Sequence, residues 1–415
     1  MEVSKMADSK VQPRMGNTGF IIFLALLSAF VPLSTDLYLP ALPEMTKFFA
    51  VPEIVMNLTL ILFFVFYSIA TLFWGPLSDR YGRRPILLVG LTLYMLASIL
   101  CGIATNAYEI IFFRILQAIG GGVATTVATA VIKDVFVGRK QETTLAIVQS
   151  MVVISPAVAP VIGSLLLTFI SWRGIFFAQA LLGLSVIYGS IIFKETHASE
   201  RGTTSVMKSF GRLGALLINP GFTALLVTFS LMSIVSLSYI SSSSYIFQNT
   251  FHLSSRMFSL FFSFNAIGML LGPLVYIPLS KYIDRFTIVY TAFGFTIVAG
   301  ILVMVFGRMS PIAFALTQFP ATLASSAVRP PGTYLVLKQE ENDNGSASAL
   351  YSAGGTIFGS VGMVIVSLAE STPVAAIAWI NIVMGGNLRF AAVAVDDLFE
   401  KEDCGLRFIH ACCVT

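Results

Sequence analysis

The sequence predicts an all-α membrane protein whose twelve transmembrane helices form two six-helix lobes that are pseudo-repeats of each other. Three observations predict this class. The 415 residues are 56% hydrophobic and only 11% charged, whereas soluble domains carry about 25% charged residues. Twelve apolar stretches are each long enough to cross a bilayer. Lys and Arg alternate between the connections that join them. A soluble multidomain protein, a secreted disulfide scaffold and a disordered chain are thereby excluded.

The apolar stretches divide into two sets of six. We expect an N-terminal tail (1–17), a first lobe (18–193), a hydrophilic linker (194–220), a second lobe (221–395) and a divergent tail (396–415). The predicted helices span residues 18–40, 55–77, 86–105, 109–132, 143–168, 174–193, 221–245, 257–280, 287–306, 311–337, 345–368 and 374–395. The tenth contains the helix-breaking run Arg329-Pro330-Pro331. The twelfth is the weakest, because polar residues interrupt it.

The distribution of Lys and Arg predicts the orientation. One side of the membrane receives 18 of these residues and the other receives 4. By the positive-inside rule both termini are cytoplasmic, and the chain is a multi-pass protein of the plasma membrane. The first stretch follows a polar tail without a small-residue cleavage site, which favours a retained helix over a signal peptide. The net charge of only +4 argues against a nucleic-acid partner.

A faint internal repeat supports the two-lobe plan. Residues 76–78 (PLS) recur at 278–280, with an offset of 202 residues, about half the chain. Parallel six-helix halves are typical of secondary transporters, which bind substrate between the halves near the bilayer midplane.

Asp36 is the acidic residue that lies well inside a predicted span; Glu109 and Glu370 lie at span edges. An intramembrane carboxylate is a functional hypothesis by default. Asp36 lies roughly 6 Å below the outer end of its helix and Arg114 roughly 7–8 Å below the end of the fourth helix. This common depth predicts an Asp36–Arg114 pair, and Gln117, on the same helical face as Arg114, is predicted to join it. Movement of the helices would let Asp36 gain and lose a proton. The alternative is a static ion pair that holds the helix register.

A dense charge motif, GPLSDRYGRRP, follows the second predicted helix. Its first glycine allows close approach of another helix, and its second permits a tight turn. One Asp beside three Arg can lock one arrangement of helices and release it in another. The alternative is a topology signal with an incidental acid. The motif positions are Gly75, Asp79, Arg80, Gly82, Arg83 and Arg84.

The fifth predicted helix carries two prolines and a glycine. Pro156 and Pro160 remove backbone donors and predict a bend. Gly163 reduces side-chain bulk where we expect the opposite lobe to meet this helix. Proline-kinked helices are also found as simple packing features.

These segments together resemble the major facilitator superfamily. The charge motif is similar to that family's loop signature. Residues 34–43 (STDLYLPALP), 114–120 (RILQAIG) and 155–163 (SPAVAPVIG) resemble its drug:proton antiporter branch, and more narrowly the Bcr/CflA group of bacterial drug exporters. The resemblance implies a twelve-helix transporter of the bacterial inner membrane. It also implies export of amphiphilic, chloramphenicol- or bicyclomycin-type drugs against protons.

The resemblance further implies roles for the residues above. Asp36, Arg114 and Gln117 would couple proton movement to transport, and the charge motif would gate the conformational change. The motif of the fifth predicted helix, Pro156, Pro160 and Gly163, would prevent leak during the antiport cycle. No cofactor is expected, since the proton gradient drives transport. We expect a monomer with a small drug, protons and the bilayer as partners.

Polar side chains among Phe and Met are candidates for substrate contact, because a mostly apolar cavity with few polar anchors suits amphiphilic ligands. Aromatic residues of membrane proteins also form interfacial belts. The candidates are Tyr38, Asn57, Tyr239, Tyr245 and Asn265.

Other functional classes are disfavoured. The spans lack the paired Asp, or His with a nucleophile, of an intramembrane enzyme, and the chain has no GxxxxGK[ST] phosphate loop. His410 among Cys404, Cys412 and Cys413 fits no zinc spacing, so no metal is expected. Two alternatives remain open: an uptake carrier or symporter for another small solute, and a transport-inactive relative with a degenerate C-terminus.

Overall fold

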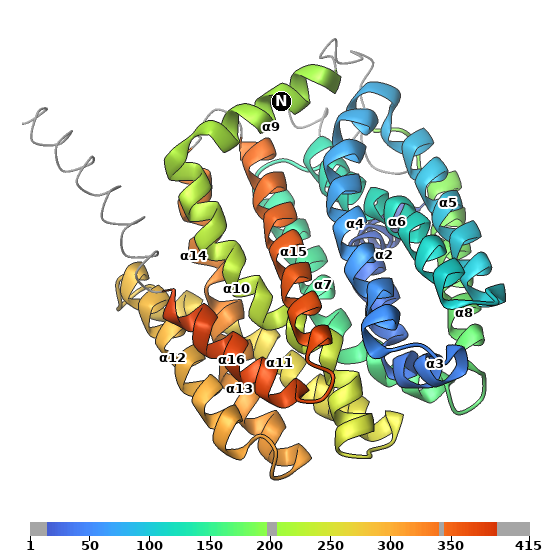
Figure 1. Cartoon of the computed structure of the whole chain (residues 1–415). Coiled ribbons are helices and arrows are strands. Elements are labelled where there is room, and N and C mark those ends of the chain that lie inside the picture. Colours follow the sequence, from blue (N-terminus) through green and yellow to red (C-terminus); the bar gives the residue numbers. More distant parts are fainter. Residues whose placement is uncertain (1–14, 197–205, 340–343, 388–415) are drawn as a thin grey trace, which may run out of the picture.

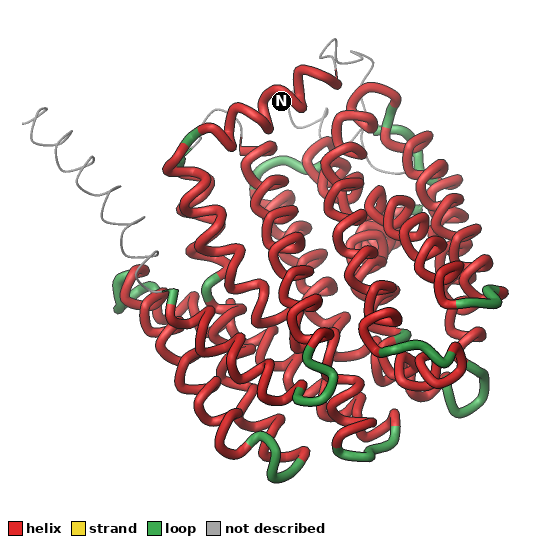
Figure 2. The backbone as a smooth tube through the Cα atoms, viewed as in Figure 1, coloured by secondary structure: helices red, strands yellow, loops and turns green. Residues whose placement is uncertain are grey.

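The computed structural model describes residues 15–196, 206–339 and 344–387, and this part of the chain is helical without β-strands (Figure 2). The first half contains α2 (Gly16–Leu37), η1 (Leu39–Ala41), α3 (Leu42–Phe49), α4 (Glu53–Tyr81), α5 (Arg83–Ile103), α6 (Ala107–Val135), α7 (Arg139–Leu166) and α8 (Trp172–Ile192). The second contains α9 (Val206–Ile218), α10 (Pro220–Tyr245), η2 (Ile246–Thr250), α11 (Ser255–Leu279), α12 (Arg285–Phe306), α13 (Pro311–Ala327), α14 (Arg329–Lys338), α15 (Asn344–Leu368) and α16 (Pro373–Gly386).

Within the described residues, ten helices are long and apolar enough to cross a membrane. The tenth predicted span is divided at Val328 into α13 and α14. Pro330 and Pro331 lie in the first turn of α14, where the missing N–H groups would have no helical partner. The twelfth span is the short α16, of 14 residues. The predicted linker contains the helix α9. The predicted C-terminal tail, the end of the twelfth span and residues 1–14 lie outside the described residues.

The predicted twelve-helix, two-lobed fold is confirmed. In Figure 1, α2 and α4 to α8 form one lobe, and α10 to α16 form the other. In the first lobe α2 packs on α7, α4 on α6, and α5 on α8. In the second lobe α10 packs on α15, α11 on α13, and α12 on α16. These are the same pairings shifted by six spans, which is the arrangement expected of a repeated half.

Two symmetry-related helix pairs join the lobes: α4 packs on α15, and α7 on α11. The helices α3 and α9 lie at opposite ends of the bundle (Figure 1), and we call these the α3 end and the α9 end. One buried hydrophobic cluster takes side chains from both lobes near the α3 end, among them Leu39, Leu60 and Phe258. Two further clusters each lie within a single lobe.

Candidate functional site

Arg114 of α6 is fully buried within the first lobe. Its guanidinium lies between two aromatic rings, 4.4 Å from the centre of Tyr38 and 4.1 Å from that of Phe63. Nε donates to the carbonyl of Thr59 at 3.4 Å, and Nη1 donates to Gln117, which confirms the predicted contact between these two residues. Nη2 has no partner among the described residues. Aromatic faces attract a desolvated cation strongly, so the rings stabilise the charge without a carboxylate.

Asp36 is also buried, near the end of α2. The Thr35 hydroxyl donates to its carboxylate at 3.3 Å. No Lys or Arg of the described residues forms an ion pair with it. The expected Asp36–Arg114 pair is therefore absent from this conformation. Equal depth on two helices does not fix their rotation, and Arg114 turns toward Tyr38 and Phe63 instead.

A hydrogen-bond network extends from Gln117 to α2. The side-chain amide of Gln117 donates to the Ser98 hydroxyl at 2.6 Å and to the Gln179 side-chain oxygen at 2.9 Å. Gln179 of α8 donates to the carbonyl of Ser34 at 2.8 Å, and the Tyr94 hydroxyl donates to the Ser34 hydroxyl at 2.5 Å. The network links four helices, since its members come from α2, α5, α6 and α8. The sequence analysis did not select Gln179, Ser98 or Tyr94, because single polar residues in apolar helices give no partner signal.

The charge motif forms a compact structure at the α9 end. Arg83 binds Asp79 at 2.5 Å, Asp134 of α6 at 2.9 Å, and the Ser78 hydroxyl at 2.6 Å. Gly82 joins α4 to α5 with φ +99°, a conformation that disfavours other residues. The motif thus ties α4, α5 and α6 together, and the predicted tight turn at Gly82 is present.

The other motif residues have different surroundings. Arg84 donates to the carbonyls of Ser190 and Ile191 at the end of α8. Arg80 lies over the ring of its neighbour Tyr81. The expected close helix approach at Gly75 is absent, since an added Cβ would lie 3.7 Å from Thr126, an ordinary contact.

Glu195 binds this motif from the beginning of the linker. Its carboxylate accepts the backbone N–H groups of Arg83 and Arg84 at 3.1 and 2.9 Å. An acid at a helix N-terminus is stabilised by the helix dipole. A Cβ at position 82 would lie 2.8 Å from Glu195, which is a second reason for glycine there.

The Pro156, Pro160 and Gly163 motif of the fifth predicted helix contacts both lobes, but Gly163 does so differently from the prediction. Pro156 and Pro160 lie inside a single continuous helix, α7. An added Cβ on Gly163 would collide with the carbonyl oxygen of Leu37. Gly163 therefore allows close approach of α2 in its own lobe, and the prediction that it faces the opposite lobe is wrong. The opposite lobe binds nearby carbonyls instead: Ser259 donates to Pro160 at 2.8 Å and Ser263 to Ala157 at 2.5 Å.

The five candidate substrate residues are all buried and fall into three groups. Asn57 and Tyr245 connect the lobes, because Asn57 donates to Ser367 at 2.8 Å and the Tyr245 and Thr46 hydroxyls are 3.0 Å apart. Tyr38 lies against Arg114 and contacts the Thr59 hydroxyl at 3.1 Å. Tyr239 and Asn265 lie inside the second lobe, where Tyr239 stacks on Phe262 at 5.9 Å.

Further hydrogen bonds join the lobes at the α3 end. Ser244 and Gln248 donate to the carbonyls of Leu39 and Pro40 at 2.6 and 3.0 Å, Asn249 donates to Glu53 at 2.8 Å, and Ile54 N–H donates to Glu370 at 3.0 Å. All of these groups lie near the loops and helix ends on the α3 side. The lobes are thus closed against each other at this end.

The fold and the buried polar site define a multi-pass membrane transporter built from two pseudo-equivalent lobes. The Major Facilitator Superfamily profile matches residues 24–363, and the chain belongs to that superfamily. An uncharacterized MFS-type transporter, YdgK of Bacillus subtilis, is 28% identical over 87% of this chain and 92% of its own length.

Two relatives that match a shorter part of the chain are named as drug resistance proteins. A chloramphenicol resistance protein of Pseudomonas aeruginosa is 35% identical over 41% of this chain and 40% of its own length. The multidrug resistance protein MdtL of Escherichia coli is 30% identical over 44% of this chain and 46% of its own length. The chain thus matches under half the length of each of these two relatives.

Solved structures agree on the fold. A peptide transporter POT has a TM-score of 0.74 at 14% identity and covers 94% of this chain and 98% of its own. The xylose transporter XylE of E. coli has a TM-score of 0.67 at 13% identity and covers 89% and 95%. At these identities the likeness establishes the fold alone.

Proposed function

We propose that the protein exports amphiphilic drugs in exchange for protons, and that its two lobes rock between states open to opposite sides of the bacterial inner membrane. Both termini lie in the cytoplasm in this proposal, so the α9 end faces the cytoplasm and the α3 end faces outward. The partial matches to resistance proteins support this class of substrate.

The observation that carries the proposal is the buried Asp36, to which the Thr35 hydroxyl donates and which has no cationic partner among the described residues. A carboxylate inside a membrane protein is costly as an anion unless a counter-charge compensates it. In the conformation closed at the α3 end, proton binding removes that cost. A change of lobe arrangement that hydrates Asp36 or brings a cation to it favours proton release. Asp36 is therefore the proposed proton carrier.

Arg114 and Gln117 have supporting roles in this proposal. Arg114 holds a fixed positive charge beside α2, and Gln117 connects it to the network that reaches Ser34, two residues before Asp36. A shift of α2 against α6 changes the field at Asp36 and so couples its protonation to lobe movement. The Asp79–Arg83–Asp134 group keeps α4, α5 and α6 together during that movement.

The test uses everted membrane vesicles energised by respiration, with proton release measured on addition of chloramphenicol or a cationic amphiphile. We expect drug-dependent proton release from the wild type and none from Asp36→Asn at equal membrane content. Glu109→Gln is the matched control, since Glu109 caps the start of α6 by bonding Thr105, and it should behave as wild type. Equal release from Asp36→Asn would rule out this carboxylate as the carrier. Proton movement in the opposite direction would favour a symporter, and no drug-dependent movement in the wild type would overturn drug–proton exchange.

A further inference from the structure

The second lobe contains four buried polar side chains whose hydrogen-bonding capacity is incompletely used. They are Tyr239 of α10, Asn265 of α11, Gln318 of α13 and Asn381 of α16, and each is 0% exposed. The unpartnered atoms are the Tyr239 hydroxyl, Asn265 Oδ1, Gln318 Nε2 and Asn381 Oδ1. Buried polar atoms without partners are rare in native proteins, and each requires a physical reason.

These side chains form two pairs that both contact α13, Gln318 with Asn381 and Asn265 with Tyr239, and we call the four residues the second-lobe cluster. Asn381 donates to Gln318 Oε1 at 2.8 Å. Asn265 makes a long contact of 3.4 Å to the carbonyl of Ala315, one helical turn from Gln318. The Tyr239 hydroxyl faces Asn265 without forming a hydrogen bond of good geometry. The cluster therefore offers both donors and acceptors from four helices.

The first lobe contains a bonded counterpart of the Gln318–Asn381 pair. Asn381 lies 202 residues after Gln179, the offset of the internal repeat. Gln179 accepts from Gln117 at 2.9 Å and donates to Ser34 at 2.8 Å. Gln117 and Gln179 thus form an amide pair equivalent to Gln318 and Asn381, but one whose polar atoms all have partners. Unpartnered amide atoms in this pair are therefore a feature of the second lobe, whereas the first-lobe pair bonds all of its own.

The helices that carry the cluster are nearly free of charge. The sequences of α10, α13 and α16 contain no Asp, Glu, Lys or Arg, and α11 contains only Arg256, in its first turn. An ionic group placed among these side chains would lack a counter-charge. A hydroxyl, amide or carbonyl group would satisfy the unpartnered atoms without that penalty.

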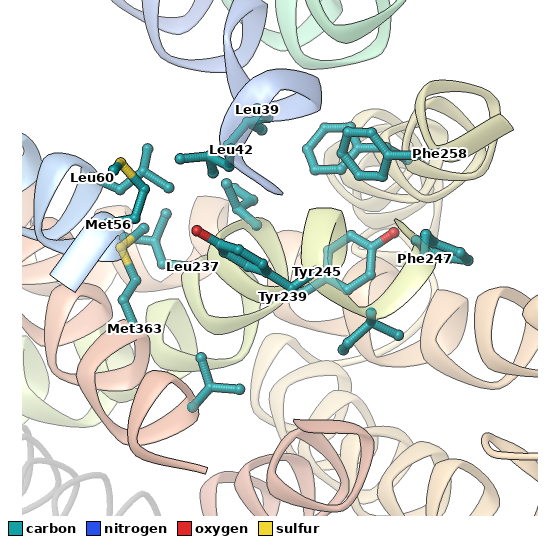
Figure 3. Close-up of a cluster of buried hydrophobic side chains, with 14 of the residues drawn as sticks. Leu39, Leu42, Met56, Leu60, Leu237, Tyr239, Tyr245, Phe247, Phe258 and Met363 are labelled. Carbon is teal, nitrogen blue, oxygen red and sulfur yellow. The ribbon is translucent and has the colours of Figure 1, made fainter. Parts of the chain in front are cut away.

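The cluster reaches the seam between the lobes through Tyr239. This residue belongs to the hydrophobic cluster shared by both lobes, and Figure 3 shows it near Tyr245, with Leu39, Leu42, Met56 and Leu60 of the first lobe close by. Tyr239 is therefore the member of the four that lies where the two lobes meet. We propose that Tyr239, Asn265, Gln318 and Asn381 form a subsite for an uncharged hydroxyl or amide group of the substrate. The inference rests on the proposed function and narrows its substrate class to uncharged, hydrogen-bonding amphiphiles.

A matched pair of ligands tests the subsite. Thiamphenicol is an uncharged amphiphile with two hydroxyls and an amide, and florfenicol differs from it only by fluorine in place of the primary hydroxyl. Equilibrium binding of both to the purified full-length protein gives the preference for the hydroxyl. We expect the wild type to prefer thiamphenicol. Tyr239→Phe and Gln318→Met should each weaken thiamphenicol binding about three- to tenfold, the effect of one lost hydrogen bond, and should change florfenicol binding little.

The controls separate binding from folding. The Tyr239 hydroxyl has no hydrogen-bond partner, so Tyr239→Phe should leave the thermal unfolding midpoint unchanged. Tyr188→Phe, at an exposed position of α8, should leave the affinity for both ligands unchanged. The subsite is overturned if thiamphenicol does not bind the wild type. It is also overturned if both Tyr239→Phe and Gln318→Met bind thiamphenicol in preference to florfenicol as strongly as the wild type does. If the wild type prefers thiamphenicol to florfenicol but vesicles show no drug-dependent proton release, the proposed antiport is contradicted and the subsite is retained.

Discussion

Glu370, which follows α15, accepts a hydrogen bond from the backbone N–H of Ile54 at 3.0 Å, so a carboxylate of one lobe binds the first turn of α4 in the other. Beside it, Asn249 donates to Glu53 at 2.8 Å. A helix N-terminus attracts an anion by about 0.3–1 kcal/mol at an exposed site. The α3 end is therefore closed in part by individually weak bonds, as the proposed alternation between two open states requires.

Removal of this carboxylate should shift the lobes toward the state open at the α3 end. Glu370→Ala deletes the acceptor for Ile54 and leaves the packed core intact. Spin labels at Tyr108 and Met309, exposed positions near this end of each lobe, report the separation in double electron–electron resonance. We expect a larger long-distance population in Glu370→Ala. Glu44→Ala, an exposed acid of α3, is the control and should leave the distances unchanged; identical distributions in both variants would argue against the gate.

Two glycine substitutions should have opposite effects on stability. Gly163→Ala places a methyl group against the carbonyl of Leu37, whereas nothing lies within 4 Å of a Cβ at Gly214 in α9. We expect Gly163→Ala to lower the free energy of unfolding by about 1–3 kcal/mol. Gly214→Ala should raise it by about 0.5–1 kcal/mol through helix propensity. Thermal melts in detergent by circular dichroism measure both. A neutral Gly163→Ala would mean that α2 and α7 move apart easily.

Arg114→Lys should damage the first lobe although it keeps the charge. A lysine lacks the planar group that lies between Tyr38 and Phe63 and that also binds Gln117. We expect a loss of about 2 kcal/mol of stability and loss of drug-dependent proton release. Lys133→Arg, at the end of α6, is the control for replacing one basic side chain by the other, and it should behave as wild type. Wild-type behaviour of Arg114→Lys would show that only the charge matters.

Substitution of Asp79 and substitution of Arg83 in the charge motif should lower the stability of the protein by different amounts. The Asp79 side chain is 59% exposed, whereas that of Arg83 is 6% exposed and also binds Asp134 and Ser78. Asp79→Asn should cost at most about 1 kcal/mol, as exposed ion pairs do. Arg83→Ala should cost about 2–3 kcal/mol, because it breaks charged hydrogen bonds at a buried site. Denaturant titrations of the purified variants test this order, and equal losses would contradict it.

Local features of the sequence determined much of the fold. Hydropathy over about 20 residues located the membrane-length helices, because a bilayer imposes its thickness on each helix separately. Pro330 and Pro331 were recognised as helix breakers, but we expected one helix over 311–337, and the structure divides that span at Val328 into α13 and α14. Gly82 marked the tight turn between α4 and α5. The contact between Arg114 and Gln117 was predictable as well, since residues three apart share one face of a helix.

Only the tertiary structure decided which groups meet between helices. Sequence gives the depth of a residue along its helix, but the rotation of that helix and the identity of its neighbours depend on packing of the whole bundle. Arg114 therefore turns to Tyr38 and Phe63 and not to Asp36, and Gly163 meets α2 of its own lobe. The amide pair of Gln318 and Asn381 joins residues 63 positions apart, and no local pattern in an apolar helix specifies such a partner.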